Sequence, residues 1–175
     1  MAWQVLAEGA PRALLVAPGA RAAAERSLVA CAPEEGIGLL AGRVMGRRHD
    51  RRTGVAVHFL PLANTAPDRR RLFALAAPDL ARALAHVGAR GLVPLAVVHS
   101  HPGAPPRPSR LDAEGSWAEL LTVIVGGPDR PLWRAYASGA APTGALRAVP
   151  LALSRRRGRG APRGLGTRRV GGVAP

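Results

Sequence analysis

Short apolar runs, separated by glycine, proline and charged positions, recur along most of the chain. Runs of this length that are rich in branched aliphatic residues are typical of buried strands. We expect strands at 13–17, 37–42, 55–62, 92–98, 121–125, 132–137 and 145–153. A further run at 3–7 indicates either a hairpin partner of the first strand or an arm that precedes it.

Two segments show the apolar spacing of an amphipathic helix. Residues 20–31 are alanine-rich with charged positions on one side, and residues 78–87 place Leu80, Leu84 and Val87 on one face. Between the strands, residues 43–54 are typical of a hairpin turn. The order of elements predicts an α/β fold, a curved mixed β-sheet flanked by helices.

The length of 175 residues and the hydrophobic content of 47% fit a single domain, which we assign to residues 1–153. The net charge is +14, and every basic residue is arginine. Residues 154–175 hold seven of these arginines and no acidic residue, so the domain itself carries +7. Their Arg/Gly composition predicts a disordered tail.

Several classes of protein are excluded or disfavoured by composition. Cys31 is the single cysteine of the chain, so no internal disulfide can form, and we expect it to be a small buried residue. No segment approaches the roughly 20 apolar residues of a membrane span, and residues 1–6 are too short for a signal peptide. We therefore expect a soluble cytoplasmic protein. Basic and aromatic residues do not interleave, which argues against specific nucleic-acid binding.

Two histidines, His99 and His101, directly follow the strand at 92–98. Because side chains alternate along a strand, both imidazoles point to one side and Ser100 points to the other. Pro102 and the proline-rich run after it are expected to end the strand and form a stiff loop.

A second fragment, Ser109-Arg110-Leu111-Asp112, follows this loop. Ser109 is a good N-cap for a helix that we expect to continue through residues 117–120, with Asp112 one turn in. Each fragment alone has an ordinary structural explanation, a histidine at a strand end or a helix cap. Together they bring two imidazoles and one carboxylate into reach, which is the three-ligand arrangement of an open zinc site.

The combined pattern, His-x-His, seven residues and Ser-x-x-Asp, resembles the signature of the JAMM (MPN-plus, Mov34-type) zinc metallohydrolases. That family also carries an upstream glutamate in a Glu-x-x-Gly-Leu-Leu-x-Gly context, and Glu35 rather than Glu34 stands three positions before Gly38. The resemblance covers about residues 14–153 and suggests the compact prokaryotic branch. It implies the following roles: zinc ligands His99, His101 and Asp112, general acid/base Glu35, and oxyanion stabiliser Ser109.

The same resemblance implies hydrolysis of the amide bond after the C-terminal Gly-Gly of a ubiquitin-like or sulfur-carrier protein, the partner we expect. The reaction would trim an extension or release an attached cysteine. We further expect a narrow cleft between the strand at 38–42 and the proline-rich loop, with Arg43, Arg107 and Arg110 steering an acidic carrier. A non-catalytic scaffold of the same fold, or nonspecific nucleic-acid binding through the tail, stays open as an alternative, and the oligomeric state is open too.

Overall fold

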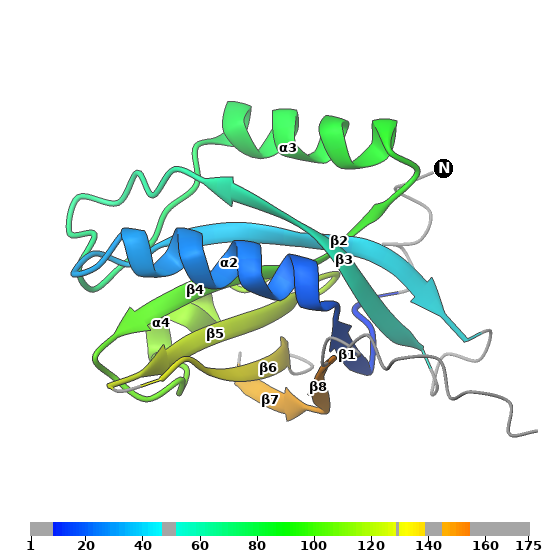
Figure 1. Cartoon of the computed structure of the whole chain (residues 1–175). Helices are drawn as coiled ribbons and strands as arrows, with labels where there is room; N and C mark the ends of the chain where they lie inside the picture. Colours follow the sequence, from blue (N-terminus) through cyan, green and yellow to red (C-terminus); the bar gives the residue numbers. More distant parts are fainter. Residues whose placement is uncertain (1–8, 47–51, 129, 139–144, 155–175) are drawn as a thin grey trace, which may run out of the picture.

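The computed structural model describes residues 9–46, 52–128, 130–138 and 145–154, which form one mixed sheet with three helices (Figure 1). The strands are β1 (Ala13–Val16), β2 (Ile37–Met45), β3 (Thr53–Leu62), β4 (Val93–Pro102), β5 (Leu121–Gly127), β6 (Leu132–Ser138), β7 (Leu146–Val149) and β8 (Leu151–Leu153). The helices are α2 (Pro18–Ala30), α3 (Ala77–Ala89) and α4 (Arg110–Glu114). Within these ranges no helix is long and apolar enough to cross a membrane. The expected arm at 3–7 and residues 155–175 of the tail lie outside the described residues.

The sheet has the order β7-β6-β5-β4-β2-β3-β1-β8. We expected one strand at 145–153, and this is wrong because Pro150 divides the segment in two. β7 pairs antiparallel with β6, whereas β8 pairs parallel with β1 at the other end of the order. A proline cannot donate to a sheet ladder, so it marks the point where the chain changes partner. The sheet is therefore curved and nearly closed.

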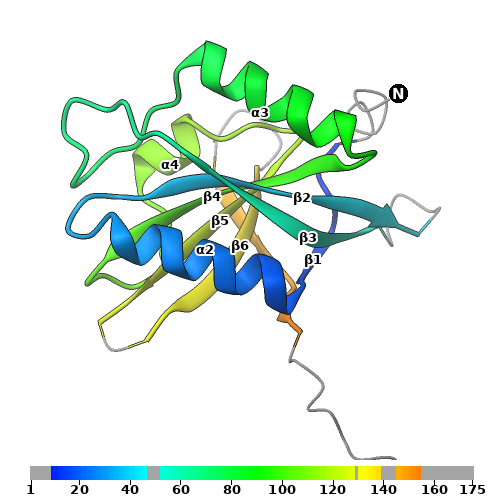
Figure 2. The same ribbon diagram turned by 45° about the horizontal axis from the view of Figure 1, so that its top comes forward.

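The two longer helices cover opposite faces of the sheet (Figure 2). Leu28 of α2 packs in one core cluster with Val98 of β4, and Val87 of α3 packs in the other with Val97. Strand alternation continues this pattern past Val98. His99 and His101 accordingly share the face of Val97, and Ser100 shares the face of α2.

The hairpin of β2 and β3 contains a bulge between Ala41 and Gly42. A Cβ on Gly42 would overlap the carbonyl of Val55, so the glycine is required by close backbone packing. β2 pairs with β3 on one side and β4 on the other, and the expected peptide cleft along 38–42 is therefore wrong. Arg43 lies towards the end of β2 remote from His99, so it cannot flank the predicted metal ligands.

Three local expectations also need correction. β4 continues through Pro102, which pairs with Gly127 of the parallel strand β5. α4 ends at Glu114 because Gly115 forms its C-cap, and Trp117 packs in a core cluster outside any helix. Cys31 is exposed, because it lies just beyond the last turn of α2 where that helix leaves the core.

Candidate metal centre

Three side chains of the types that bind metal ions converge where β4 ends and α4 begins. His99 Nε2 lies 3.1 Å from His101 Nε2 and 3.0 Å from Asp112 Oδ1, and His101 Nε2 lies 3.6 Å from Asp112 Oδ2. Tetrahedral zinc, with bonds of about 2.0–2.1 Å, spaces its ligand atoms about 3.3 Å apart. The three side chains thus fit a zinc ion with one position left open. They form the one such group among the residues that the structure describes.

Asp112 is held by a complete capping box with Ser109. The Ser109 backbone N–H donates to Asp112 Oδ2 at 2.5 Å, and the Asp112 backbone N–H donates to Ser109 Oγ at 3.1 Å. A helix of five residues has little stability of its own, so this cap fixes its start. It turns Oδ1 towards His99. The Ser109 side chain is exposed, and its hydroxyl proton has no acceptor among the described residues.

The two imidazoles are held differently. The His101 ring lies close to the backbone carbonyl of Pro105 in the proline-rich loop, which favours the protonated ring. Burial and the neighbouring His99 lower the pKa of His101, against the opposing effects of Asp112 and Pro105, and this favours the neutral ring that binds metal. His99 is fully buried, its Nδ1 has no hydrogen-bond partner among the described residues, and Phe73 packs against its ring at 4.5 Å.

Glu35 lies beside this group. Its carboxyl oxygen Oε1 is 3.9 Å from His101 Nε2, and the residue is 7% exposed. Burial, with added repulsion from Asp112 and Asp68, raises the pKa of Glu35 to about 7. Burial also disfavours the ionised form of Asp112, but the nearby His99 and hydrogen bonds from Ser109 lower its pKa to about 2. One carboxyl can therefore exchange protons near neutrality while the other stays ionised.

The neighbouring Glu34 has a different environment. Its side chain is 46% exposed and forms an ion pair with Arg69 at 3.5 Å. Of the two adjacent glutamates, Glu35 is the one directed to the imidazoles, as the sequence register predicts.

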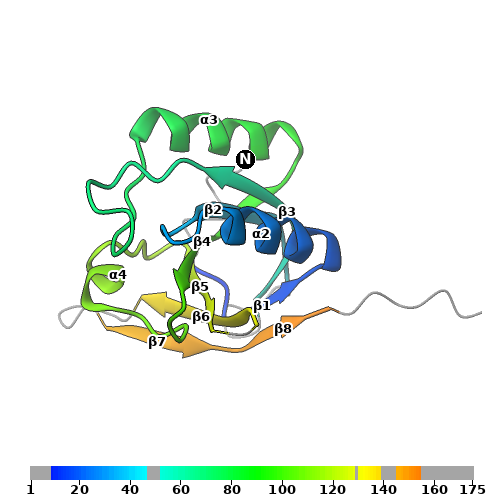
Figure 3. The ribbon, with the colours of Figure 1, turned by 60° about the vertical axis from the view of Figure 1, so that its left-hand side comes forward.

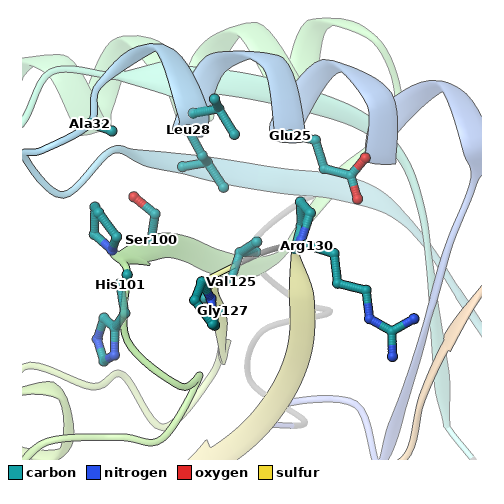
Figure 4. A pocket seen from close by; sticks show the side chains of 14 residues that line it. Glu25, Leu28, Ala32, Ser100, His101, Val125, Gly127 and Arg130 are labelled. Carbon is teal, nitrogen blue, oxygen red and sulfur yellow. The ribbon is translucent and has the colours of Figure 1, made fainter.

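A cavity of about 320 Å³ lies on the other side of β4, between α2 and the turn that joins β5 to β6. Figure 4 shows Ser100 directed towards α2, whereas the His101 ring lies on the opposite side of the strand. Ser100 Oγ accepts a hydrogen bond from the Gly36 N–H at 2.9 Å. The side chain of Ser100, which points away from His101, therefore holds the residue next to Glu35 in place.

Two residues near the site, Asn64 and Phe73, had no signal in the sequence. Both belong to the loop between β3 and α3. Asn64 bonds to the backbone of Glu35, 29 positions away, and Phe73 contacts His99. Contacts over such separations leave no local pattern in a single sequence.

A curved mixed sheet with a His-x-His strand end, an aspartate in the next helix and a buried glutamate defines a JAB/MPN-type domain. Residues 18–138 match the model of a family described as prokaryotic homologs of the JAB domain. The chain belongs to this family, which is related to the JAMM hydrolases.

Solved structures support the same fold. A solution structure of a protein from Desulfitobacterium hafniense is 22% identical, with a TM-score of 0.68 over 81% of this chain and 92% of that one. A solution structure of a protein from Salinibacter ruber is 27% identical, with a TM-score of 0.53 over the same shares of the two chains. No curated protein matches the chain.

The raised pKa of Glu35 predicts that the folding stability of the metal-free protein falls as the pH rises. Since the folded value of about 7 exceeds the ordinary 4.5, stability present below pH 4.5 is lost as the pH rises through about 7. Glu35→Gln removes this loss. The metal-free variant should exceed the parent protein by up to about 3 kcal/mol at pH 8 and match it near pH 4, in urea unfolding after chelation.

Glu34→Gln is the matched control and should show no such gain. Equal stability of the Glu35→Gln variant and the parent protein at pH 8 would mean that the Glu35 carboxylate is well solvated without metal.

Proposed function

We propose that this protein is a zinc-dependent metallopeptidase or isopeptidase that hydrolyses the amide bond after the C-terminal Gly-Gly of a ubiquitin-like or sulfur-carrier protein. The reaction would trim an extension or release an attached cysteine. The observation that carries the proposal is the convergence of His99, His101 and Asp112 beside Glu35, a buried carboxyl with a pKa raised to about 7. Membership of a family related to JAMM hydrolases supports it.

Two side chains, Glu35 and Ser109, carry out the proton transfers and hydrogen bonding of the proposed reaction. Zinc, when bound, supplies Lewis acidity towards a water molecule and a substrate carbonyl. Glu35 accepts the proton of the attacking water and then delivers it to the leaving amine, a role that its buried carboxyl beside His101 is placed to perform. Ser109 donates its hydroxyl proton to the carbonyl oxygen as negative charge develops there.

The depth of the site supports a preference for glycine. His99 is fully buried, and Asp112 and Glu35 are 5% and 7% exposed. A scissile carbonyl must approach these groups closely, and a side chain on the preceding residue would meet the walls of the site. Two glycines have no Cβ and remove this obstacle.

A non-catalytic scaffold is the weaker alternative. Such a protein would gain nothing from a buried Glu35 whose ionisation is opposed by burial and by Asp112. A local cost of this kind is typical of functional sites and is selected against in purely structural ones.

Cleavage of a defined carrier tests the proposal. The zinc-loaded protein should convert a carrier ending in Gly-Gly plus an extension into one ending at the second glycine, as seen by intact mass spectrometry. Replacing that glycine by alanine should reduce kcat/KM at least about 10-fold, because the added methyl meets the site walls. Moderate salt should mainly raise KM, since any steering by surface arginines is screened.

A carrier with the same extension after two alanines controls for cleavage by contaminating proteases. If glycine and alanine substrates were cut equally, a general peptidase would replace the proposed specificity.

A further inference from the structure

The backbone N–H and the backbone carbonyl of Glu35 both form hydrogen bonds with one segment. This segment is the loop of residues 63–76 between β3 and α3, here called the Asn64 loop. The Glu35 N–H donates to the Arg69 carbonyl at 2.6 Å. Asn64 Nδ2 donates to the Glu35 carbonyl at 2.9 Å. Figure 3 shows this loop on the same side of the molecule as α4, which carries Asp112.

The Asn64 side chain uses its full hydrogen-bonding capacity. Besides Glu35, its Nδ2 donates to the Leu72 carbonyl at 2.9 Å, and its Oδ1 accepts from the N–H groups of Ala66 at 3.0 Å and Ala74 at 3.1 Å. An amide offers two donors and two acceptor lone pairs, so all four are occupied. Asn64 therefore folds the Asn64 loop and ties it to Glu35 with a single side chain.

Gly36, the residue after Glu35, is hydrogen-bonded to β4, the strand that carries His99 and His101. Gly36 N–H donates to Ser100 Oγ, and the Gly36 carbonyl accepts from the Ser100 N–H, both at 2.9 Å. Ser100 stands between the ligands His99 and His101. The Asn64 loop also places Phe73 against His99. The Glu35 backbone is thus clamped between the Asn64 loop and the strand that presents both imidazoles.

We propose that Asn64 is a positioning residue that sets the Glu35 carboxyl over the metal ligands, and this rests on the proposed function for its catalytic readout. A general base must stand within hydrogen-bond reach of the proton it takes, and a displacement of about 1 Å can cost about 100-fold in rate. Asn64 controls that placement through the Glu35 backbone while touching no metal ligand.

Asn64→Asp tests this, because aspartate keeps both acceptor bonds of Oδ1 and replaces the donor to Glu35 with an acceptor that repels its carbonyl. We expect kcat to fall at least about 10-fold, with KM within about two-fold and the zinc content unchanged. In a Glu35→Gln background the same substitution should add less than about two-fold, because the group that Asn64 positions is already inactive.

Thr65→Ala is the matched control. It removes the bond from Thr65 Oγ1 to the Ala74 carbonyl in the same loop. Among the described residues Thr65 forms no hydrogen bond with Glu35, so kcat should stay within about two-fold of the parent value. A fall in the control as large as that of Asn64→Asp, or an undiminished effect in the Glu35→Gln background, would reduce Asn64 to a structural role. Should Asn64→Asp fail to fold, Asn64→Ser, which retains one hydroxyl donor, takes its place.

Amide hydrogen exchange of the metal-free protein supplies a readout independent of turnover. In the parent protein the Glu35 N–H donates to the Arg69 carbonyl. This N–H should exchange at least about 10-fold faster in Asn64→Asp than in the parent protein, and at the parent rate in Thr65→Ala. Unchanged protection at Glu35 would overturn the clamp. Faster exchange in a protein with no hydrolytic activity would support the clamp and reject the proposed function.

Discussion

Glu35→Gln should lower kcat/KM on a Gly-Gly carrier by about 100-fold or more while the protein retains one zinc per chain. Glutamine preserves the shape of the side chain but cannot accept a proton, and loss of a general base typically costs 100-fold to 10,000-fold. The zinc content should hold because Glu35 Oε1 lies 3.9 Å from His101 Nε2, outside the convergent group of ligand atoms. Steady-state kinetics and metal analysis of the same preparation measure both quantities.

The adjacent glutamate gives the control. Glu34→Gln breaks only a surface ion pair with Arg69 and should change kcat/KM by less than about two-fold. If the Glu34 variant were the inactive one, the assignment of the family glutamate to Glu35 would be wrong.

The double variant His99→Ala, His101→Ala should lose zinc entirely, from one equivalent per chain to none after reloading and buffer exchange. It removes two of the three ligands, and a lone carboxylate such as Asp112 holds zinc weakly. The parent protein should also gain stability with zinc, about 2.7 kcal/mol at a free concentration 100 times Kd, or about 5–10 °C in Tm. The double variant should gain none.

His86→Ala controls for unspecific effects of histidine loss. His86 is exposed on α3, where its ring stacks on His58 with centroids 5.9 Å apart. The His86 variant should bind one zinc with an unchanged gain in Tm. Full zinc stoichiometry in the double variant would place the metal elsewhere.

Much of the ligand geometry could be predicted because local rules govern it. Strand alternation puts His99 and His101 on one side, and the capping preference of Ser109 starts a helix that carries Asp112 back to them. Each rule acts over a few residues, so a single sequence is enough to apply it. The α/β class, and the element order up to residue 138, are confirmed for the same reason.

The errors concern features set by distant parts of the chain. The segment at 38–42 is not an edge strand of the sheet, because it pairs with β4, which lies more than 50 positions later in the sequence. The strand switch at Pro150 depended on β1 accepting β8. Cys31 is exposed because α2 leaves the core one turn earlier than the apolar pattern suggests. The bonds of Asn64 likewise join segments that no local pattern connects.

The capping box at the start of α4 also bears on how such domains change over evolutionary time. One oxygen of Asp112 holds the helix start and the other faces His99. Asparagine at this position would still accept from the Ser109 N–H through its carbonyl oxygen, but it would present an amide to the imidazoles and bind metal poorly. A single codon change would therefore abolish the proposed metal binding while the fold survives, so a lineage that lost the proposed activity need not lose the protein.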